Sequence, residues 1–386
     1  MEKFEMIAKT LFGFEELLAA ELEEIGATDI ELLKRAVKYR GDQEVLYKSN
    51  YLLRTAIKVL KPITTFQVRN EYQLYDQIKK IDWEDYMTVN QTLAIEGTTS
   101  GEIFTHSKYV ALKSKDAVVD QFRDKYDKRP SVDTEDPDLR INVHIAEDQC
   151  TVSLDSSGVT LNKRGYRLRQ VFAPMSEVLA SGILMLTGWD KKRNLINPMC
   201  GSGTVAIEAT LMARNVPAGY FRDFAFQYWK DFDQALWKKI KDEAIEKITD
   251  MEGKIYASDI ELNAIKVSID NAERAGVDEF IEFEKEDFLE SKAKLEDALV
   301  IINPPYGERL EEAEDMVEFY KEIGTQLKHG YNGCDAWILS GNLDAIKFVG
   351  LRPSRKIKLF NGPIDCKLHK FELYRGSKKA SKQGKV

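Results

Sequence analysis

The stretch Asn197-Pro198-Met199-Cys200-Gly201-Ser202-Gly203-Thr204 decides the fold of the second half of the chain. It follows a short apolar strand predicted at residues 194–196 and precedes a helix predicted at residues 205–214. The two glycines at this bend allow positive φ angles and let the backbone approach a bound molecule closely. A plain strand-to-helix turn would explain these glycines equally well, so the later turns have to decide whether this turn binds a ligand.

The residues beyond this turn alternate between strand and helix patterns, as they do in a parallel sheet. We predict strands at residues 254–258, 280–283, 298–302 and 336–340, helices at 262–275 and 313–328, and an antiparallel strand pair at 356–360 and 368–374. The sequence therefore predicts an α/β fold with an open, mostly parallel seven-stranded sheet, an antiparallel edge and helices on both faces.

The first part of the chain has a mixed α+β pattern. Helices are predicted at residues 14–25, 47–59 and 117–126, and strands at 93–96, 141–145 and 150–154. A turn-rich stretch interrupts this pattern at residues 128–138, and a domain boundary is predicted at Ser156-Ser157-Gly158. The 386 residues are enough for two or three domains.

The composition, 43% hydrophobic and 31% charged, is ordinary for a globular protein. No apolar run approaches the ~18 residues of a membrane span, and the N-terminus lacks the pattern of a signal peptide. We therefore expect a cytoplasmic protein without a membrane partner. The four cysteines and four histidines are too scattered for zinc-ligand spacing, so we expect buried free thiols and no metal.

The net charge of −8 argues against a polyanionic partner, but binding depends on where the charges lie. Three stretches without acidic residues could contact phosphates or could simply be solvated surface. They are Lys163, Arg164, Arg167 and Arg169; Arg352, Arg355, Lys356 and Lys358; and, in the tail, Arg375, Lys378, Lys379, Lys382 and Lys385. A nucleic-acid partner thus stays open.

Carboxylates follow the second and third predicted strands of the parallel sheet. Asp259 is placed to accept hydrogen bonds from both hydroxyls of a ribose, although it could also cap a helix. It lies much farther from Gly203 than the ~20 residues expected in a dinucleotide fold, and an aromatic-rich insertion at residues 215–253 accounts for the excess. Asp287 could accept from an adenine amino group, with Phe288 or Ile260 packing on the ring, or it could be a capping residue.

The fourth turn is the most informative. A buried-strand pattern at residues 299–302 is followed by Asn303-Pro304-Pro305-Tyr306-Gly307. The prolines remove two backbone donors and leave carbonyl acceptors, the asparagine adds a side-chain acceptor, and the tyrosine offers a ring for stacking. Acceptors beside an aromatic ring suit the amino group of a planar base.

The segments around Gly201, Asp259, Asp287 and Asn303 resemble the successive motifs of class I S-adenosylmethionine-dependent methyltransferases. Asn-Pro-Pro-Tyr is similar to the catalytic motif of the amino-methyltransferases that modify adenine N6 or guanine N2. Several segments resemble bacterial 23S ribosomal RNA guanine-N2 methyltransferases. They are residues 164–167, 173–177 and 197–204, Glu208-Ala209, and Gly307 with Arg309. The N-terminal region resembles a ferredoxin-like segment and a THUMP domain, through residues 129–133 and 139–144.

This resemblance implies a domain order and a set of site residues. The domains would be a ferredoxin-like segment (1–45), a THUMP-like RNA-binding domain (46–157), a Rossmann-like class I methyltransferase domain (158–375) and a basic tail (376–386). S-adenosyl-L-methionine would be bound by Ser176, Asn197, Pro198, Cys200, Gly201, Gly203, Thr204, Asp259, Ile260, Asp287, Phe288 and Asn303. Asn303, Pro304, Pro305 and Tyr306 would act on the target amino group, and Lys163, Arg164, Arg167, Arg169 and Arg309 would contact RNA.

The substrate implied is guanine N2 in 23S ribosomal RNA or in a large-subunit assembly intermediate. An adenine-N6 methyltransferase acting on DNA or RNA is the main alternative, because Asn-Pro-Pro-Tyr serves both reactions. Methylation of a small molecule or of a protein glutamine, and a non-catalytic RNA-binding role, are further alternatives.

Overall fold

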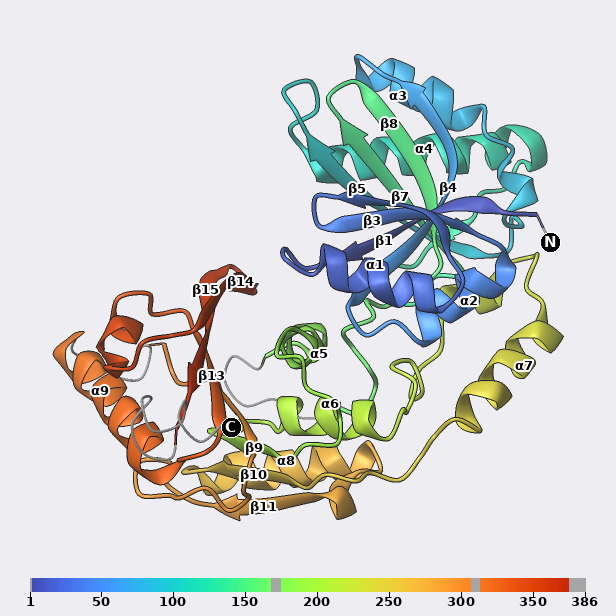
Figure 1. Cartoon of the computed structure of the whole chain (residues 1–386). Coiled ribbons are helices and arrows are strands. Elements are labelled where there is room, and N and C mark those ends of the chain that lie inside the picture. Colours follow the sequence, from blue (N-terminus) through green and yellow to red (C-terminus); the bar gives the residue numbers. More distant parts are fainter. Residues whose placement is uncertain (1, 168–174, 307–312, 375–386) are drawn as a thin grey trace. The chain divides into compact units, whose positions relative to one another are not determined.

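The computed structural model describes residues 2–167, 175–306 and 313–374 (Figure 1). The chain forms two compact units, and each unit includes one short segment from the part of the sequence that otherwise forms the other unit. The first unit is Met1–Thr10, Leu18–Leu161 and Arg222–Glu243, and the second is Leu11–Leu17, Asn162–Phe221 and Ala244–Val386. Within the described part of the chain, no helix is both long and apolar enough to span a membrane.

The first unit is built on an eight-stranded sheet with the order β2-β3-β1-β4-β8-β7-β5-β6. Its strands are β1 (Phe4–Thr10), β2 (Thr28–Leu33), β3 (Ala36–Gly41), β4 (Ala56–Gln67), β5 (Thr92–Ser100), β6 (Ser131–Val132), β7 (Leu139–Ala146) and β8 (Gln149–Asp155). All neighbours are antiparallel except β5, which runs parallel to β6 and β7. The helices of this region are α1 (Glu15–Glu24), α2 (Gln43–Tyr51), α3 (Glu71–Lys79) and α4 (Ser107–Tyr126), with the short helix η1 (Trp83–Asp85).

The helix predicted at residues 47–59 is wrong. Helix α2 ends at Tyr51, and β4 begins at Ala56. The carboxylate of Glu21 accepts hydrogen bonds from the backbone N–H groups of Arg54 (2.7 Å) and Thr55 (3.0 Å), which turns the chain out of the helix. The β-branched residues that follow then pair with β1 and β8.

The second unit confirms the predicted α/β fold. Its seven strands have the order β11-β10-β9-β12-β13-β15-β14, with a parallel run from β11 to β13 and an antiparallel edge of β15 and β14. The strands are β9 (Leu195–Pro198), β10 (Ile255–Asp259), β11 (Ile281–Lys285), β12 (Leu299–Ile302), β13 (Asp335–Ser340), β14 (Arg355–Asn361) and β15 (Ile364–Glu372). The helices are α5 (Glu177–Leu186), α6 (Thr204–Ala213), α8 (Leu262–Arg274) and α9 (Ala313–Gly330), with η3 (Asp278–Phe280) and η4 (Ala345–Val349).

Part of the insertion predicted at residues 215–253 packs with the first unit, although the sequence places it inside the region 158–375. Its ordered elements are η2 (Ala225–Tyr228) and α7 (Gln234–Ile245). The ring of Phe226 stacks on Tyr47 of α2 at 4.3 Å, and Trp237 lies edge-on to Tyr51 at 5.1 Å. Burial of these aromatic rings holds the segment against α2.

Candidate active site

The glycine turn after β9 is a tight left-handed loop. Met199, Gly201 and Gly203 have φ angles of +58°, +60° and +77°. A Cβ atom at Gly203 would lie 3.0 Å from Cβ of Ser268 on α8, so a side chain there would push this helix away. The turn therefore needs glycine at Gly203 for both its backbone conformation and its packing, and it leads directly into α6.

Asp259, the last residue of β10, connects the glycine turn with the turn that follows β10. Its Oδ2 accepts from the N–H of Gly201 (2.9 Å), and its Oδ1 accepts from the N–H of Glu261 (3.0 Å). A carboxylate oxygen has two lone pairs, so each can accept more than one hydrogen bond. The next residue, Ile260, is 56% exposed and presents an apolar side chain beside the carboxylate.

The loop after β11 carries Asp287 and Phe288, which are predicted to contact the adenine of the cofactor. Asp287 is half-buried, and its Oδ1 accepts from the N–H of Leu289 at 2.9 Å, as in a capping role. Phe288 is 2% exposed and packs against Tyr331 in the hydrophobic core, with ring centroids 5.3 Å apart. The prediction that the Phe288 ring packs on an adenine is therefore corrected, because this ring lies in the core, and Ile260 is the exposed apolar residue of the pair.

Asn197 joins the two central strands of the site. Its side chain is 1% exposed, and Nδ2 donates to the carbonyl of Ile301 on β12 (2.9 Å). Its Oδ1 is buried and has no hydrogen-bond partner among the described residues. A buried acceptor without a donor is unfavourable by about 1–3 kcal/mol, so this oxygen is suited to a ligand that carries a donor.

The remaining residues predicted for the cofactor have local roles. Ser176 is the N-cap of α5, where its Oγ accepts from the N–H of Leu179 (3.2 Å). Cys200 is buried, and burial raises the pKa of its thiol to about 12, which keeps the thiol neutral. Pro198 ends β9 inside the core.

Two of the predicted RNA-binding arginines lie in the protein interior. Arg164 is 2% exposed, and its Nε lies 3.8 Å from Oε1 of the fully buried Glu208. This carboxylate also accepts from the hydroxyls of Tyr166 (2.9 Å) and Ser181 (2.7 Å).

Arg167 donates to Oγ1 of Thr204 (2.7 Å) and to the carbonyl of Met175 (3.0 Å), and it pairs with Glu177 at 3.3 Å. The prediction that Arg164 and Arg167 contact RNA is therefore corrected, because both guanidinium groups are engaged in the interior behind the glycine turn. Lys163 is exposed, and Arg169 and Arg309 lie outside the described residues.

The loop after β12 holds its asparagine and tyrosine together. Asn303, Pro305 and Tyr306 are half-buried and Pro304 is buried. The hydroxyl of Tyr306 donates to Oδ1 of Asn303 at 2.6 Å. Burial is the main cause that raises the pKa of Tyr306 above its ordinary value, so the phenol stays protonated and remains a donor.

Residues after β13, which the sequence analysis did not single out, support this loop. A Cβ at Gly341 would lie 2.8 Å from Cδ2 of Tyr306, so the tyrosine ring occupies the space that a side chain would need. Nδ2 of Asn342 lies 3.5 Å from the carbonyl of Tyr306. A Gly-Asn pair directly after a predicted strand was the available signal, because it stands at the same sheet edge as the other turns.

The sheet order brings these turns together. Strand β9 lies between β10 and β12, and all three run parallel. The glycine turn, Asp259 and the Asn303 loop therefore follow the carboxyl ends of adjacent strands, which is where open α/β sheets bind ligands.

The chain matches three family models. The RMKL-like methyltransferase domain is matched by residues 164–370, the THUMP domain by residues 68–155, and the RlmL ferredoxin-like domain by residues 5–60. The chain belongs to the RMKL-like methyltransferase family. Its cofactor is S-adenosylmethionine, as predicted.

Individual relatives of this family agree with the assignment. The chain is 39% identical to the candidate RNA methyltransferase slr0064 of Synechocystis sp., over 94% of this chain and 95% of that protein. It is 36% identical to ribosomal RNA large subunit methyltransferase K/L of Syntrophotalea carbinolica, over 94% of this chain but 52% of that protein. It therefore spans about half the length of this second relative.

A solved structure shares the whole architecture. SMU.472, a candidate methyltransferase crystallised with S-adenosylhomocysteine, has a TM-score of 0.87 and 26% sequence identity, and the match covers 98% of this chain and 100% of that one.

Proposed function

We propose that this RMKL-like methyltransferase transfers a methyl group to the exocyclic amino group of a base in RNA, namely guanine N2 of 23S ribosomal RNA. The observation that carries the proposal is the asparagine oxygen at the end of β12. Oδ1 of Asn303 accepts a 2.6 Å hydrogen bond from Tyr306. Asn303 follows β12, and β12 pairs with β9, the strand that leads into the glycine turn.

The residues around the glycine turn fit S-adenosylmethionine, which supplies an activated methyl group when bound. The buried, unpartnered Oδ1 of Asn197 suits a donor such as the ammonium group of an amino acid. The carboxylate of Asp259, at the carboxyl end of β10, suits ribose hydroxyls, and the exposed Ile260 suits one face of an adenine ring. The Asp287 carboxylate accepts one backbone N–H and keeps acceptor capacity for the adenine amino group.

Asn303 and its neighbours would orient the target amine. Oδ1 of Asn303 accepts one hydrogen bond from Tyr306, and its second lone pair can accept a hydrogen bond from an amino N–H. Pro304 and Pro305 contribute carbonyl acceptors and no competing donors. Positioning the nucleophile in this way accounts for a large part of catalysis in a group transfer, and the amine releases its proton only once it is methylated.

The RNA substrate is proposed from the N-terminal region and the relatives. Residues 68–155 match the THUMP model, and the names of the relatives slr0064 and K/L specify RNA and large-subunit ribosomal RNA. A base inside folded RNA has to be unpaired or flipped out to reach such a site. An assembling large subunit offers such bases, and a cytoplasmic location follows from this proposal.

Adenine N6 is the alternative target, because the same loop would accept its amino group. The experiment that separates the two is nucleoside mass spectrometry of 23S ribosomal RNA from a deletion strain, before and after treatment with the purified protein and S-adenosylmethionine. We expect N2-methylguanosine to be missing in the deletion strain and to be restored by the protein. Appearance of N6-methyladenosine after treatment would overturn the guanine assignment. If the treatment methylates no base of this RNA, RNA as the substrate would be overturned.

A further inference from the structure

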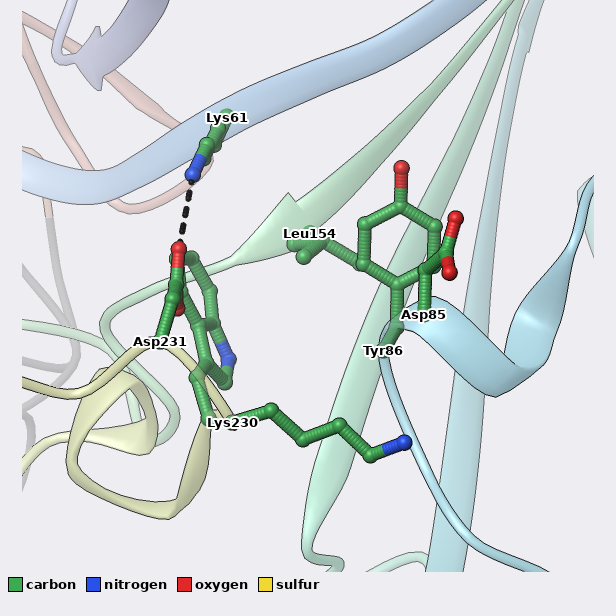
Figure 2. A pocket seen from close by; sticks show the side chains of 7 residues that line it. Lys61, Asp85, Tyr86, Leu154, Lys230 and Asp231 are labelled. Carbon is green, nitrogen blue, oxygen red and sulfur yellow. Dashed lines mark hydrogen bonds and ion pairs between the residues drawn. The ribbon is translucent and has the colours of Figure 1, made fainter.

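A small pocket in the first unit, with polar and apolar lining, is not explained by methyl transfer. It has a volume of about 210 Å³ and is lined by Lys61, Asp85, Tyr86, Leu154, Trp229, Lys230 and Asp231 (Figure 2). These residues come from β4, from η1 and the residue after it, from β8, and from the insertion segment that follows η2. The pocket is smaller than the ~300–1,000 Å³ of drug-sized ligand sites, so it suits one ring system and not a whole cofactor.

The charges of the pocket favour a neutral occupant. Lys61 pairs with Asp231 at 3.2 Å (Figure 2). Its Nζ also lies 4.4 Å from the centre of the Phe4 ring. Two lysines are thus balanced by two aspartates, so the pocket offers no net positive charge to offset the desolvation of a phosphate. A neutral ring that carries both donors and acceptors meets no such penalty.

Some hydrogen-bonding groups of the pocket have partners among the described residues, and others do not. Trp229 is 5% exposed, and its indole Nε1 has no partner among the described residues. Lys230 donates to the carbonyl of Glu84. The carboxylate of Asp85 is exposed and makes no hydrogen bond or ion pair with the residues that the structure describes. The buried indole N–H and the exposed Asp85 carboxylate are therefore a donor and an acceptor that no described side chain engages.

Tyr86 adds a further donor. Burial, and next the carboxylates of Asp85 and Asp231, raise the pKa of Tyr86, so its hydroxyl stays protonated. Leu154 is 3% exposed and supplies an apolar wall. The occupant is thus expected to be flat and partly apolar, with donors facing a carboxylate and acceptors facing N–H or O–H groups.

We propose that this pocket binds an unpaired guanine of the RNA, apart from the base that is methylated. Guanine carries two adjacent donors, N1–H and the N2 amino group, which match the two oxygens of a carboxylate such as Asp85. Its O6 and N7 acceptors match the Trp229 N–H and a lysine ammonium group. Adenine and cytosine place a ring acceptor beside their amino group, and that acceptor would face the carboxylate unfavourably. Proteins that read RNA by sequence commonly do so through such unpaired bases.

The proposal rests on RNA being the substrate, and it gives the insertion a role. Trp229, Lys230 and Asp231 belong to the segment that packs with the first unit. The pocket shares no residue with the site around Asn303. It would hold the RNA by a second base while the target base is modified.

The test is fluorescence anisotropy of the full-length protein, without S-adenosylmethionine, on short uridine oligonucleotides that carry one guanosine, inosine or adenosine. We expect the guanosine oligonucleotide to bind about 10-fold more tightly than all-uridine RNA, inosine to bind at an intermediate level because it lacks the amino group, and adenosine to give no gain. Asp85→Asn and Trp229→Phe should each reduce the guanosine preference to about 2-fold while all-uridine binding is kept. Lys238→Gln, which alters an exposed lysine of α7 outside the pocket, should leave the preference unchanged.

Asn303→Ala separates this pocket from the methyltransferase site. The guanosine preference should persist in Asn303→Ala and disappear in Asp85→Asn. Equal binding of guanosine and uridine oligonucleotides by the wild type, or a full preference in Asp85→Asn, would overturn the pocket proposal. A protein that shows the preference but methylates no RNA would contradict the proposed function alone, so the two failures are distinguishable.

Discussion

The hydroxyl of Tyr306 donates a 2.6 Å hydrogen bond to Oδ1 of Asn303. The phenol donates and the amide oxygen of Asn303 accepts, so the tyrosine holds this oxygen in place. Gly341 leaves the space in which the tyrosine ring packs. The asparagine of this loop is therefore oriented by a contact within its own motif.

Tyr306→Phe should lower the single-turnover rate of methyl transfer by about 10-fold, since the loss of one hydrogen bond frees the Asn303 amide to rotate. Tyr306→Ala should be slower still, because the ring is lost as well. Calorimetric affinity for S-adenosylhomocysteine should be unchanged in Tyr306→Phe. A full rate in this variant would show that the hydroxyl does not position Asn303.

Asp259→Ala should weaken cofactor binding by about 1.5–3 kcal/mol, the scale of hydrogen bonds to a charged group. It also removes the acceptor for the N–H of Gly201. Asp259→Asn keeps one oxygen and should lose less affinity. Isothermal titration calorimetry with S-adenosylhomocysteine measures both, and unchanged affinity in Asp259→Ala would exclude this carboxylate from the ribose site.

Glu208→Gln should lower the free energy of unfolding by about 3 kcal/mol, because it removes the buried carboxylate that pairs with Arg164. The matched control is Glu243→Gln, which breaks an exposed pair with Lys239 on α7 and should change stability by less than about 0.5 kcal/mol. Urea unfolding compares the two variants. Equal stability of both would contradict a structural role for the Arg164–Glu208 pair.

His369 should make stability depend on pH. It is 4% exposed, and burial is the main cause that lowers its pKa to about 4. The unfolded chain takes up this proton below about pH 6.5, while the folded protein does so only near its lowered pKa. This contribution to stability should therefore be complete above about pH 6.5 and be reduced by up to about 2 kcal/mol at pH 5.

The difference in unfolding free energy between pH 7.5 and pH 5 isolates this effect. It should be smaller in His369→Gln than in the wild type and unchanged in His329→Gln, an exposed histidine of α9. An identical pH dependence in the wild type and His369→Gln would contradict a neutral buried His369.

The sequence predicted the second unit well because its signals are local. Each strand of the parallel sheet is a short buried run, and each turn that follows carries a glycine, a carboxylate or the Asn303 motif, so order alone locates the site. The helix predicted at residues 47–59 failed because its end depends on Glu21, a side chain distant in sequence that binds the backbone of Arg54 and Thr55.

Burial of charged and aromatic residues could not be read from the sequence. Arg164 and Arg167 stand in a basic stretch that is typical of a phosphate-binding surface, yet their partners Glu208 and Glu177 come from α6 and α5. Phe288 follows a strand in the same way as Ile260 does, but tertiary packing places one in the core and the other at the surface.

The most direct test of the account is the single-turnover methyl-transfer rate of Asn303→Ala, measured together with its affinity for S-adenosylhomocysteine. Asn303 is proposed to act on the amine during transfer, so we expect the rate to fall by about 10²-fold or more while cofactor affinity stays within a few-fold. A variant that transfers methyl groups at the wild-type rate would contradict the central claim that Asn303 orients the target amino group.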